Sequence, residues 1–333
     1  MAVYTELSQE QQIELVAKAV PGFLAQYKLD GATFKNVNHG FNSSFKVDAT
    51  DGCSYSLRIN TNSKKSAAQV EAEIRLLELI ASKKVIDAPV PVRTSSGHAY
   101  SKISLDFLGR DVTAVLNHWI DGEDLGDEIT EAELIRLGAA MAKLHKFSKE
   151  IPDKLVNIFP RIDRTLFNSP DNLRKKESRF DAEMRSLIDQ AFEISDAVFT
   201  EISKSSDPIV IHADLHPSNV LKTSTGLAVI DFDDVGVGYE IQDLAITFFY
   251  LRDMPGKEEL VLEGYRSVSE LPELKESHVE ALLLSRQLLL LNDLLDVTTA
   301  EEIAYTPEYI EISRLRIKHF LNTGRFELIR RLS

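Results

Sequence analysis

The chain has 333 residues, of which 44% are hydrophobic and 27% are charged, values typical of a globular protein that buries its own core. Its 52 acidic and 38 basic residues leave a formal net charge of −14, which argues against nucleic acid as a partner. The single cysteine, Cys53, excludes an internal disulfide. The length exceeds one ordinary domain and favours two lobes with a cleft between them.

The N-terminal 20 residues lack the basic and apolar segments of a signal peptide, and Ser8 to Val20 is typical of a capped amphipathic helix. The longest apolar run, residues 281–295, is interrupted by Arg286, Asn292 and Asp293 and is too short to cross a bilayer. We therefore expect a cytoplasmic protein with no membrane partner.

The first third of the chain predicts a small antiparallel sheet. Strand patterns cover residues 32–39, 44–50 and 53–60, and Asp51-Gly52 is a tight-turn signal between the last two. Residues 66–82 repeat apolar positions at helical spacing, and two more strand patterns follow at 98–105 and 113–120. The turn signal at Asp121-Gly122 predicts an N-terminal lobe of residues 1–120.

The remainder, residues 121–333, is expected to form a larger and mainly helical lobe. Thr130 and Glu133 form a capping-box pattern at the start of a long amphipathic helix, and residues 170–206 have helical periodicity. Two short β-branched runs, 208–212 and 227–230, each end in charged residues, and the segments after Asp243 again have helical periodicity. The predicted fold class is α+β with two unequal lobes.

The charged residues after these two runs suggest phosphoryl transfer. In HADLHPSN, Asp214 is followed five positions later by Asn219, and VIDFDD places Asp231 at the end of the next strand. One carboxylate can accept the proton of an attacking hydroxyl, while an amide and a second carboxylate hold Mg²⁺ against nucleotide phosphates. Protein kinases carry H-R-D-L-x-x-x-N and D-F-G at this spacing. Arg58 on the third strand and Glu73 on the helix are placed for the ion pair that orients phosphates in kinases.

The segments HADLHPSNVL, VIDFDD, IQDLA and LGAAMAKLH together resemble the aminoglycoside phosphotransferase and choline kinase-like family, over about residues 30–300. The DFDD form is similar to the bacterial branch that contains stress response kinase A and type II homoserine kinase-like proteins. This resemblance implies a bilobal protein-kinase-like fold, with ATP as phosphate donor and Mg²⁺ as cofactor.

Carried over by position, the resemblance implies Asp214 as catalytic base and Asn219 and Asp231 as Mg²⁺ ligands. It places His216 near the transferring phosphoryl group, with simple loop packing as the alternative, and it gives Asp243 a bracing role on the catalytic loop. The remaining implied contacts are to the nucleotide: the adenine hinge at His118 to Ile120, the phosphate loop with Gly40, Asn42 and Ser43, and the Arg58–Glu73 pair.

The acceptor is predicted to be a small-molecule hydroxyl compound, such as an amino alcohol or a homoserine-like, choline-like or aminoglycoside substrate. Ala213 replaces an arginine that reads activation-loop phosphates, and the short stretch from Asp231 to Asp243 lacks the A-P-E segment. A protein acceptor, as in a stress-type Ser/Thr protein kinase, stays open. A nucleotide-binding pseudokinase is a further alternative, because Arg58 replaces the usual lysine and the phosphate loop has one glycine.

Two rival chemistries fit the same residues less well. Asp231 and Asp233 mimic the D-x-D signature of haloacid dehalogenase-like phosphatases, but that fold requires several βα units after this strand instead of mainly helical segments. His212, Asp214 and His216 could share one face of a strand as a zinc site, yet Pro217 and the lack of further spaced ligands disfavour it.

Overall fold

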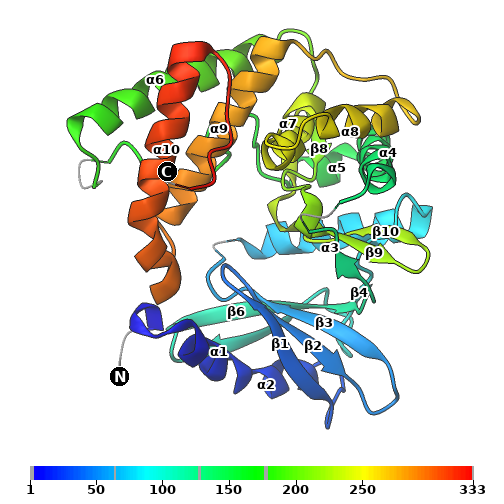
Figure 1. Ribbon diagram of the computed structural model, residues 1–333. Helices are drawn as coiled ribbons and strands as arrows, with labels where there is room; N and C mark the ends of the chain where they lie inside the picture. The colour runs from blue at the N-terminus through cyan, green and yellow to red at the C-terminus, as the bar shows by residue number, and fades with distance from the viewer. Residues whose placement is uncertain (1–3, 64, 127–128, 176–178, 332–333) are drawn as a thin grey trace. The chain divides into compact units, whose positions relative to one another are not determined.

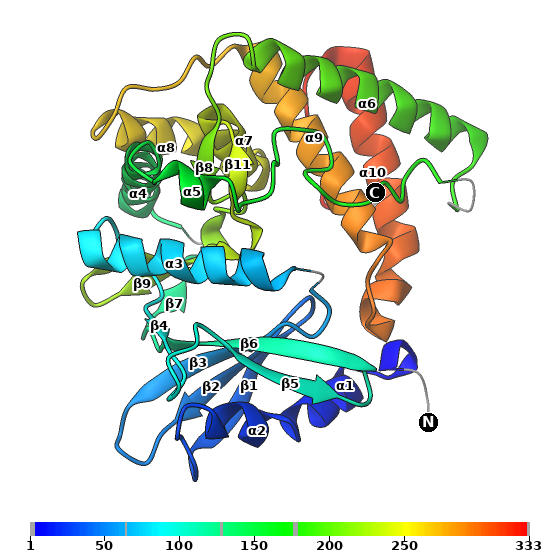
Figure 2. The ribbon, with the colours of Figure 1, turned by 180° about the vertical axis from the view of Figure 1, so that it is seen from behind.

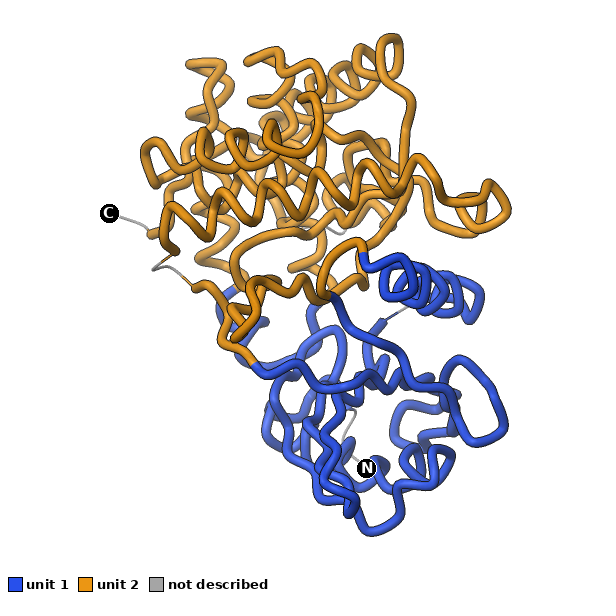
Figure 3. Tube along the Cα trace, turned by 90° about the vertical axis from the view of Figure 1, so that its right-hand side faces the viewer, with its two compact units in different colours: residues 1–84, 88–121, 297–305 blue, residues 85–87, 122–296, 306–333 orange. Residues whose placement is uncertain are grey.

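The computed structural model describes residues 4–63, 65–126, 129–175 and 179–331, and the chain divides into two compact units (Figure 3). Unit 1 comprises residues 1–84, 88–121 and 297–305, and unit 2 comprises residues 85–87, 122–296 and 306–333. One division falls between Asp121 and Gly122. The assignment of residues 297–305 to unit 1 has no counterpart in the lobes expected from the sequence.

Unit 1 is built on one antiparallel sheet with the strand order β1-β2-β3-β6-β4, and β5 pairs with β6. The tight turn between β2 and β3 has Gly52 at φ 88°, as the Asp51-Gly52 signal predicted. The strands are β1 (Thr33–His39), β2 (Ser43–Asp48), β3 (Ser54–Ile59), β4 (Pro91–Val92), β5 (Ser101–Leu105) and β6 (Arg110–His118).

The two faces of this sheet differ in polarity, because successive side chains of a strand point to opposite sides. Phe45, Val47, Leu57 and Ile59 point into a core that also contains apolar residues of the N-terminal helices. Figures 1 and 2 show α1 (Gln9–Ala17) and α2 (Val20–Ala25) along this face and α3 (Ala67–Lys83) on the other side. The polar face with Arg58 is therefore the one that α3 covers.

The helix starts follow the capping signals in the sequence. Ser8 and Gln11 form a capping box before α1, Ser66 and Gln69 before α3, and Thr130 and Glu133 before α4. The first helix ends at Ala17 and the chain turns into α2, which carries proline in its first turn.

Unit 2 is mainly helical, and its α4–α8 pair packs through glycines. A Cβ at Gly138 would run into the carbonyl oxygen of Val261, and one at Gly264 would run into that of Ile135. Both positions therefore require glycine for the close approach of the two backbones. The helices are α4 (Glu131–Ser148), α5 (Asp153–Val156), α6 (Ala182–Ile202), α7 (Glu240–Leu251), α8 (Lys257–Arg266), α9 (Glu276–Leu294) and α10 (Ala300–Thr323), the last of which begins in unit 1.

Short strands of unit 2 hold the two motif segments. The first segment follows β8 (Ile209–Ile211), which pairs with β11 (Gly236–Gly238). The second follows β10 (Gly226–Val229), which pairs with β9 (Val220–Thr223), and β9 pairs in turn with β7 (Glu123–Asp124). Each motif thus begins where a buried strand ends, as the sequence predicted.

The α+β class is confirmed, while some element boundaries are wrong. Only Ala182–Ile202 of the predicted helical stretch 170–206 is helical; residues 170–175 and 179–181 are not, and residues 176–178 lie outside the described part. Asp181, the N-cap of α6, accepts a hydrogen bond from the amide of Met184 and marks the true start. The short elements α2, α5, β4, β7, β9 and β11 were not predicted.

Candidate active site

The predicted catalytic loop leaves β8 through a left-handed residue. Ala213 has φ 66°, which is costly for a residue with a Cβ and persists only where surrounding contacts impose it. Asp214 follows, and a short 3₁₀ turn, η2 (Pro217–Asn219), brings Asn219 back to it. The Asn219 side-chain amide donates to the backbone oxygen of Asp214 at 2.8 Å and to its Oδ2 at 3.0 Å. The structure therefore brings these two predicted site residues together.

Asp243 supplies the contacts that impose this loop conformation. Its Oδ1 accepts from the amide of Ala213 at 2.8 Å and its Oδ2 from the amide of His212 at 3.2 Å. The side chain is completely buried, and its pKa is lowered because hydrogen bonds and the charge of His145, 3.0 Å away, outweigh the effect of burial. The predicted bracing role of Asp243 is confirmed.

His212 links the two motif segments. Its Nε2 donates to the carbonyl of Ile230 at 3.0 Å, so Nδ1 is the acceptor for the amide of Asp214 at 3.3 Å. The ring also packs on Phe232, with 4.7 Å between ring centroids. His212 is thus a structural residue that ties the Asp214 loop to the segment carrying Asp231.

Asp214 has two side-chain partners, one of them the charged guanidinium of Arg286, that favour its ionised form. Arg286 of α9 donates to Oδ1, and His216 Nε2 lies 3.5 Å from Oδ2. Burial alone would raise the pKa of this carboxyl, but the charge of Arg286 and the contact with His216 outweigh it and lower the pKa to about 2. The group is therefore an anion at neutral pH and can accept a hydrogen bond from a hydroxyl.

Asn219 and Asp231 lie on neighbouring backbone segments, since the amide of Ile230 donates to the carbonyl of Asn219 at 2.9 Å. The Nδ2 of Asn219 points to Asp214, so the Oδ1 of Asn219 points away from Asp214 and can accept from another group. Asp231 has φ 60°, a second left-handed residue at a motif position. An amide oxygen and a carboxylate are suitable donors for Mg²⁺, so the donor chemistry fits the predicted metal.

His216 packs in the same cluster as Asp214. Its ring lies on Tyr250 of α7, with 4.4 Å between ring centroids, and its Nδ1 accepts from the amide of Ser218. The side chain thus packs within the loop and also lies beside the predicted base. Its contact with a phosphoryl group stays a prediction.

In unit 1, the predicted ion pair is present. Arg58 Nη2 donates to both carboxylate oxygens of Glu73, at 2.7 and 2.8 Å, and both side chains are largely buried. The pair joins β3 to α3 on the polar face of the sheet. Its role towards nucleotide phosphates stays a prediction.

The predicted phosphate loop is a tight turn in which Ser43 is turned inward. A Cβ at Gly40 would meet nothing within 4 Å, so the turn is open at this position. Ser43 is completely buried instead, and its hydroxyl bonds His39 at 2.7 Å and Thr61 at 3.1 Å. A phosphate contact through this hydroxyl would require these bonds to break. The phosphate contacts expected of Gly40 and Asn42 stay predictions.

The predicted hinge follows β6. The amide of His118 donates to the carbonyl of Val90 at 2.9 Å, so this amide is already paired. Ile120 is partly buried just beyond the strand. The adenine contacts of both residues stay predictions.

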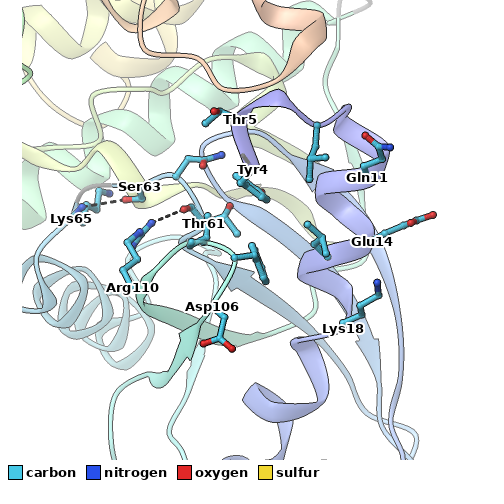
Figure 4. A pocket seen from close by; sticks show the side chains of 15 residues that line it. Tyr4, Thr5, Gln11, Glu14, Lys18, Thr61, Ser63, Lys65, Asp106 and Arg110 are labelled. Carbon is cyan, nitrogen blue, oxygen red and sulfur yellow. Dashed lines mark hydrogen bonds between the residues drawn. The ribbon is translucent and has the colours of Figure 1, made fainter. Parts of the chain in front are cut away.

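A cavity of about 900 Å³ lies within unit 1 (Figure 4). Its lining residues, among them Tyr4, Leu15, Lys18, Phe107 and Arg110, include none of the predicted site residues. Among the described residues, no cluster of three or more His, Cys, Asp or Glu side chains could hold a metal, and no helix is long and apolar enough to span a membrane.

Several residues around the motifs were missed by the sequence reasoning. Arg286 and Tyr250 contact the Asp214 loop, and His145 bonds Asp243. Asp293, on α9, interacts electrostatically with Arg286 and Asp214. The available signal was the charge within the Leu-rich run 281–295, because a buried charge requires a partner.

Comparison with known proteins agrees with this geometry. The architecture is that of the protein-kinase-like phosphotransferases: the microcompartment-associated aminopropanol kinase has a TM-score of 0.71 at 20% identity, over 95% of this chain and 100% of that one. Amicoumacin kinase, in a complex with AMP-PNP, Ca²⁺ and Ami, has a TM-score of 0.69 at 18% identity, over 90% and 92% of the two chains. A choline/ethanolamine kinase family protein from Mesorhizobium loti has a TM-score of 0.64 at 16% identity, over 93% and 95%.

The sequence itself defines the family. Residues 33–276 match the phosphotransferase enzyme family, and the chain belongs to it. No curated protein sequence matches the chain. The resemblance inferred from the motifs is therefore confirmed, as are the kinase-like fold and the assignment as a phosphotransferase.

Proposed function

We propose that the protein transfers the γ-phosphoryl group of ATP to a hydroxyl group of a small molecule. In this reaction the acceptor oxygen forms a bond to the γ-phosphorus, the bond from that phosphorus to ADP breaks, and the acceptor proton passes to the Asp214 carboxylate. The single observation that carries the proposal is the position of the Asp214 carboxylate, which is hydrogen-bonded to Asn219 and next to the segment of Asp231.

The donor groups support Mg-ATP as the phosphate source. Asn219, through its side-chain oxygen, and Asp231 would hold Mg²⁺ in unit 2. Magnesium, when bound, would neutralise charge on the phosphates. Arg58, held by Glu73 in unit 1, would contact phosphate oxygens. Two similar structures, of amicoumacin kinase and of a spectinomycin phosphotransferase, contain bound AMP-PNP and ADP, respectively. Gly40, Asn42, His118 and Ile120 complete the proposed nucleotide contacts, and Ser43 would join them only if its hydroxyl left His39 and Thr61.

The carboxylates near Asp214 favour an acceptor that also carries an amine. Asp234 interacts electrostatically with Arg286, and Asp293 interacts electrostatically with both Arg286 and Asp214. One arginine faces several carboxylates, so a cationic acceptor would be attracted to this part of unit 2. The named substrates of the similar structures include aminopropanol, amicoumacin and spectinomycin. An amino alcohol is the acceptor class we propose.

The test is phosphate transfer by the purified chain with Mg-ATP. The acceptor panel contains 1-amino-2-propanol, ethanolamine, choline, homoserine and spectinomycin, with a general protein substrate as a separate arm. ADP release and ³¹P NMR of the product report transfer, and calorimetry reports nucleotide binding. Asp214→Asn should lower kcat by at least about 1,000-fold while ATP affinity stays within about threefold. Asp189→Asn, an exposed change on α6, is the matched control.

The outcomes separate the alternatives. Transfer to an amino alcohol that Asp214→Asn abolishes supports the proposal. Transfer to the protein substrate alone would favour a protein kinase, and ATP binding without transfer to any acceptor would favour a nucleotide-binding pseudokinase. Either of the last two results overturns the proposed function.

A further inference from the structure

Arg286 is a buried cation in the middle of an apolar helix. It lies on α9, and only 5% of its side chain is exposed. Placing a guanidinium inside a protein is unfavourable unless its charge and its donors find partners. Here Nη2 donates to Asp214 Oδ1 and to the hydroxyl of Tyr250, the latter at 2.9 Å. The principal charge partner of this arginine is therefore the proposed catalytic base.

The contacts of the Asp214 carboxylate are divided between its two oxygens. Arg286 holds Oδ1, whereas Asn219 Nδ2 holds Oδ2 at 3.0 Å. A carboxylate held at both oxygens by separate elements cannot rotate about its terminal bond. Each oxygen has two lone pairs, so Oδ1 retains one acceptor position beside the arginine.

We propose that Arg286 is a positioning residue for phosphoryl transfer, which fixes the Asp214 carboxylate so that the remaining lone pair of Oδ1 receives the acceptor hydroxyl. This inference rests on the proposed function. Orientation of reacting groups contributes strongly to rate, and a misplacement of about 1 Å can cost about 100-fold. The arginine acts through Asp214 and needs no contact with the substrate.

The surroundings of Arg286 suit this role better than a purely structural one. Tyr250 accepts from the guanidinium and packs against its charge, with 5.7 Å from the arginine Cζ to the ring centroid. The same ring packs on His216 of the catalytic loop. The Nε of Arg286 is buried and has no hydrogen-bond partner among the described residues. The guanidinium thus contacts both the proposed base and the ring on which His216 packs.

The test compares four variants of the full chain with the wild type, using Mg-ATP and the panel acceptor with the highest kcat/KM. Arg286→Gln removes the charge, Arg286→Lys keeps it with one point of contact, and Tyr250→Phe removes only the supporting hydroxyl. Arg252→Gln is the matched control, because Arg252 forms a comparable ion pair with Glu280 at 3.0 Å. Thermal unfolding of each variant shows the folded fraction at the assay temperature.

Arg286→Gln should lower kcat by at least about 100-fold with KM for ATP within about threefold. Arg286→Lys should be more active than Arg286→Gln and less active than the wild type. Tyr250→Phe should lower kcat by about threefold to tenfold. The control Arg252→Gln should change kcat by less than about threefold, although its stability is lower. If Arg286→Gln does not fold, the lysine and phenylalanine variants decide. An active wild type whose Arg286 and Tyr250 variants keep their kcat overturns this inference alone. A wild type that transfers no phosphate to any acceptor overturns the proposed function, and the inference with it.

Discussion

Replacing Asp293 by asparagine should stabilise the protein at neutral pH. Asp293 lies on α9 two turns beyond Arg286 and is partly buried. Burial raises the pKa of its carboxyl from the ordinary 3.8 to about 6, and the nearby charge of Arg286 offsets this only in part. The charged form is therefore less favourable in the folded protein than in the unfolded chain.

The size and sign of the effect follow from linkage. A carboxyl whose pKa is higher in the folded state binds its proton more tightly there, so its contribution to stability is present at low pH and is lost as the pH rises to about 6. The shift of about two pH units corresponds to about 3 kcal/mol of unfolding free energy above that pH. Asp293→Asn cannot ionise, so it should be more stable than the wild type by up to about 3 kcal/mol at about pH 8, and by almost nothing at about pH 4.

Urea unfolding at these two pH values measures the difference directly. The control is Asp189→Asn, which makes the same chemical change at an exposed position of α6 and should alter stability by less than about 0.5 kcal/mol. Equal stability of Asp293→Asn and wild type at about pH 8, or a gain that is the same at both pH values, would refute the reasoning. If the gain comes with a raised KM for amine acceptors, the destabilising charge is retained for binding, as is common at functional sites.

Two further substitutions test the hydrogen bonds and the helix packing in unit 2. Asp243→Asn replaces one buried acceptor by a donor, whereas the carboxylate accepts from the amide of Ala213. The variant should therefore lose about 3 kcal/mol of unfolding free energy and most of its activity. A loss below about 1 kcal/mol would contradict the bracing role. Gly264→Ala should lower the unfolding free energy by about 3 kcal/mol, because its Cβ would meet the carbonyl of Ile135 on a facing helix. Glu263→Ala, an exposed change on the same helix, should alter it by less than about 0.5 kcal/mol in the same urea titration. Equal losses in both variants would exclude the packing explanation.

The sequence predicted the local parts of the site because their physical causes are local. Asp214 and Asn219 meet through a turn within one short segment, and the caps and strand periods around them involve neighbours a few residues apart. Strand alternation would also have predicted the inward direction of Ser43, which shares a face with Phe45 and Val47. The resemblance instead placed Ser43, three positions after Gly40, in the phosphate loop.

The long-range contacts could not be obtained in the same way. Arg286 and Asp214 are 72 positions apart, and Asp243 reaches Ala213 across 30. Periodicity shows that a charge lies in an apolar helix, but many carboxylates in the chain could pair with it. The choice among them depends on how α7 and α9 pack, which is set by the whole core of unit 2.

The backbone at the two motifs explains why such bracing contacts are needed. Ala213 and Asp231 both adopt left-handed conformations next to or at a predicted functional residue, and each costs about 1–3 kcal/mol. Asp243, which accepts two amides of the loop, and His212, which joins the loop to Ile230, help to hold this shape. Side chains outside the loop thus help to set the position of the proposed base, and Arg286 contacts the carboxylate of Asp214 itself.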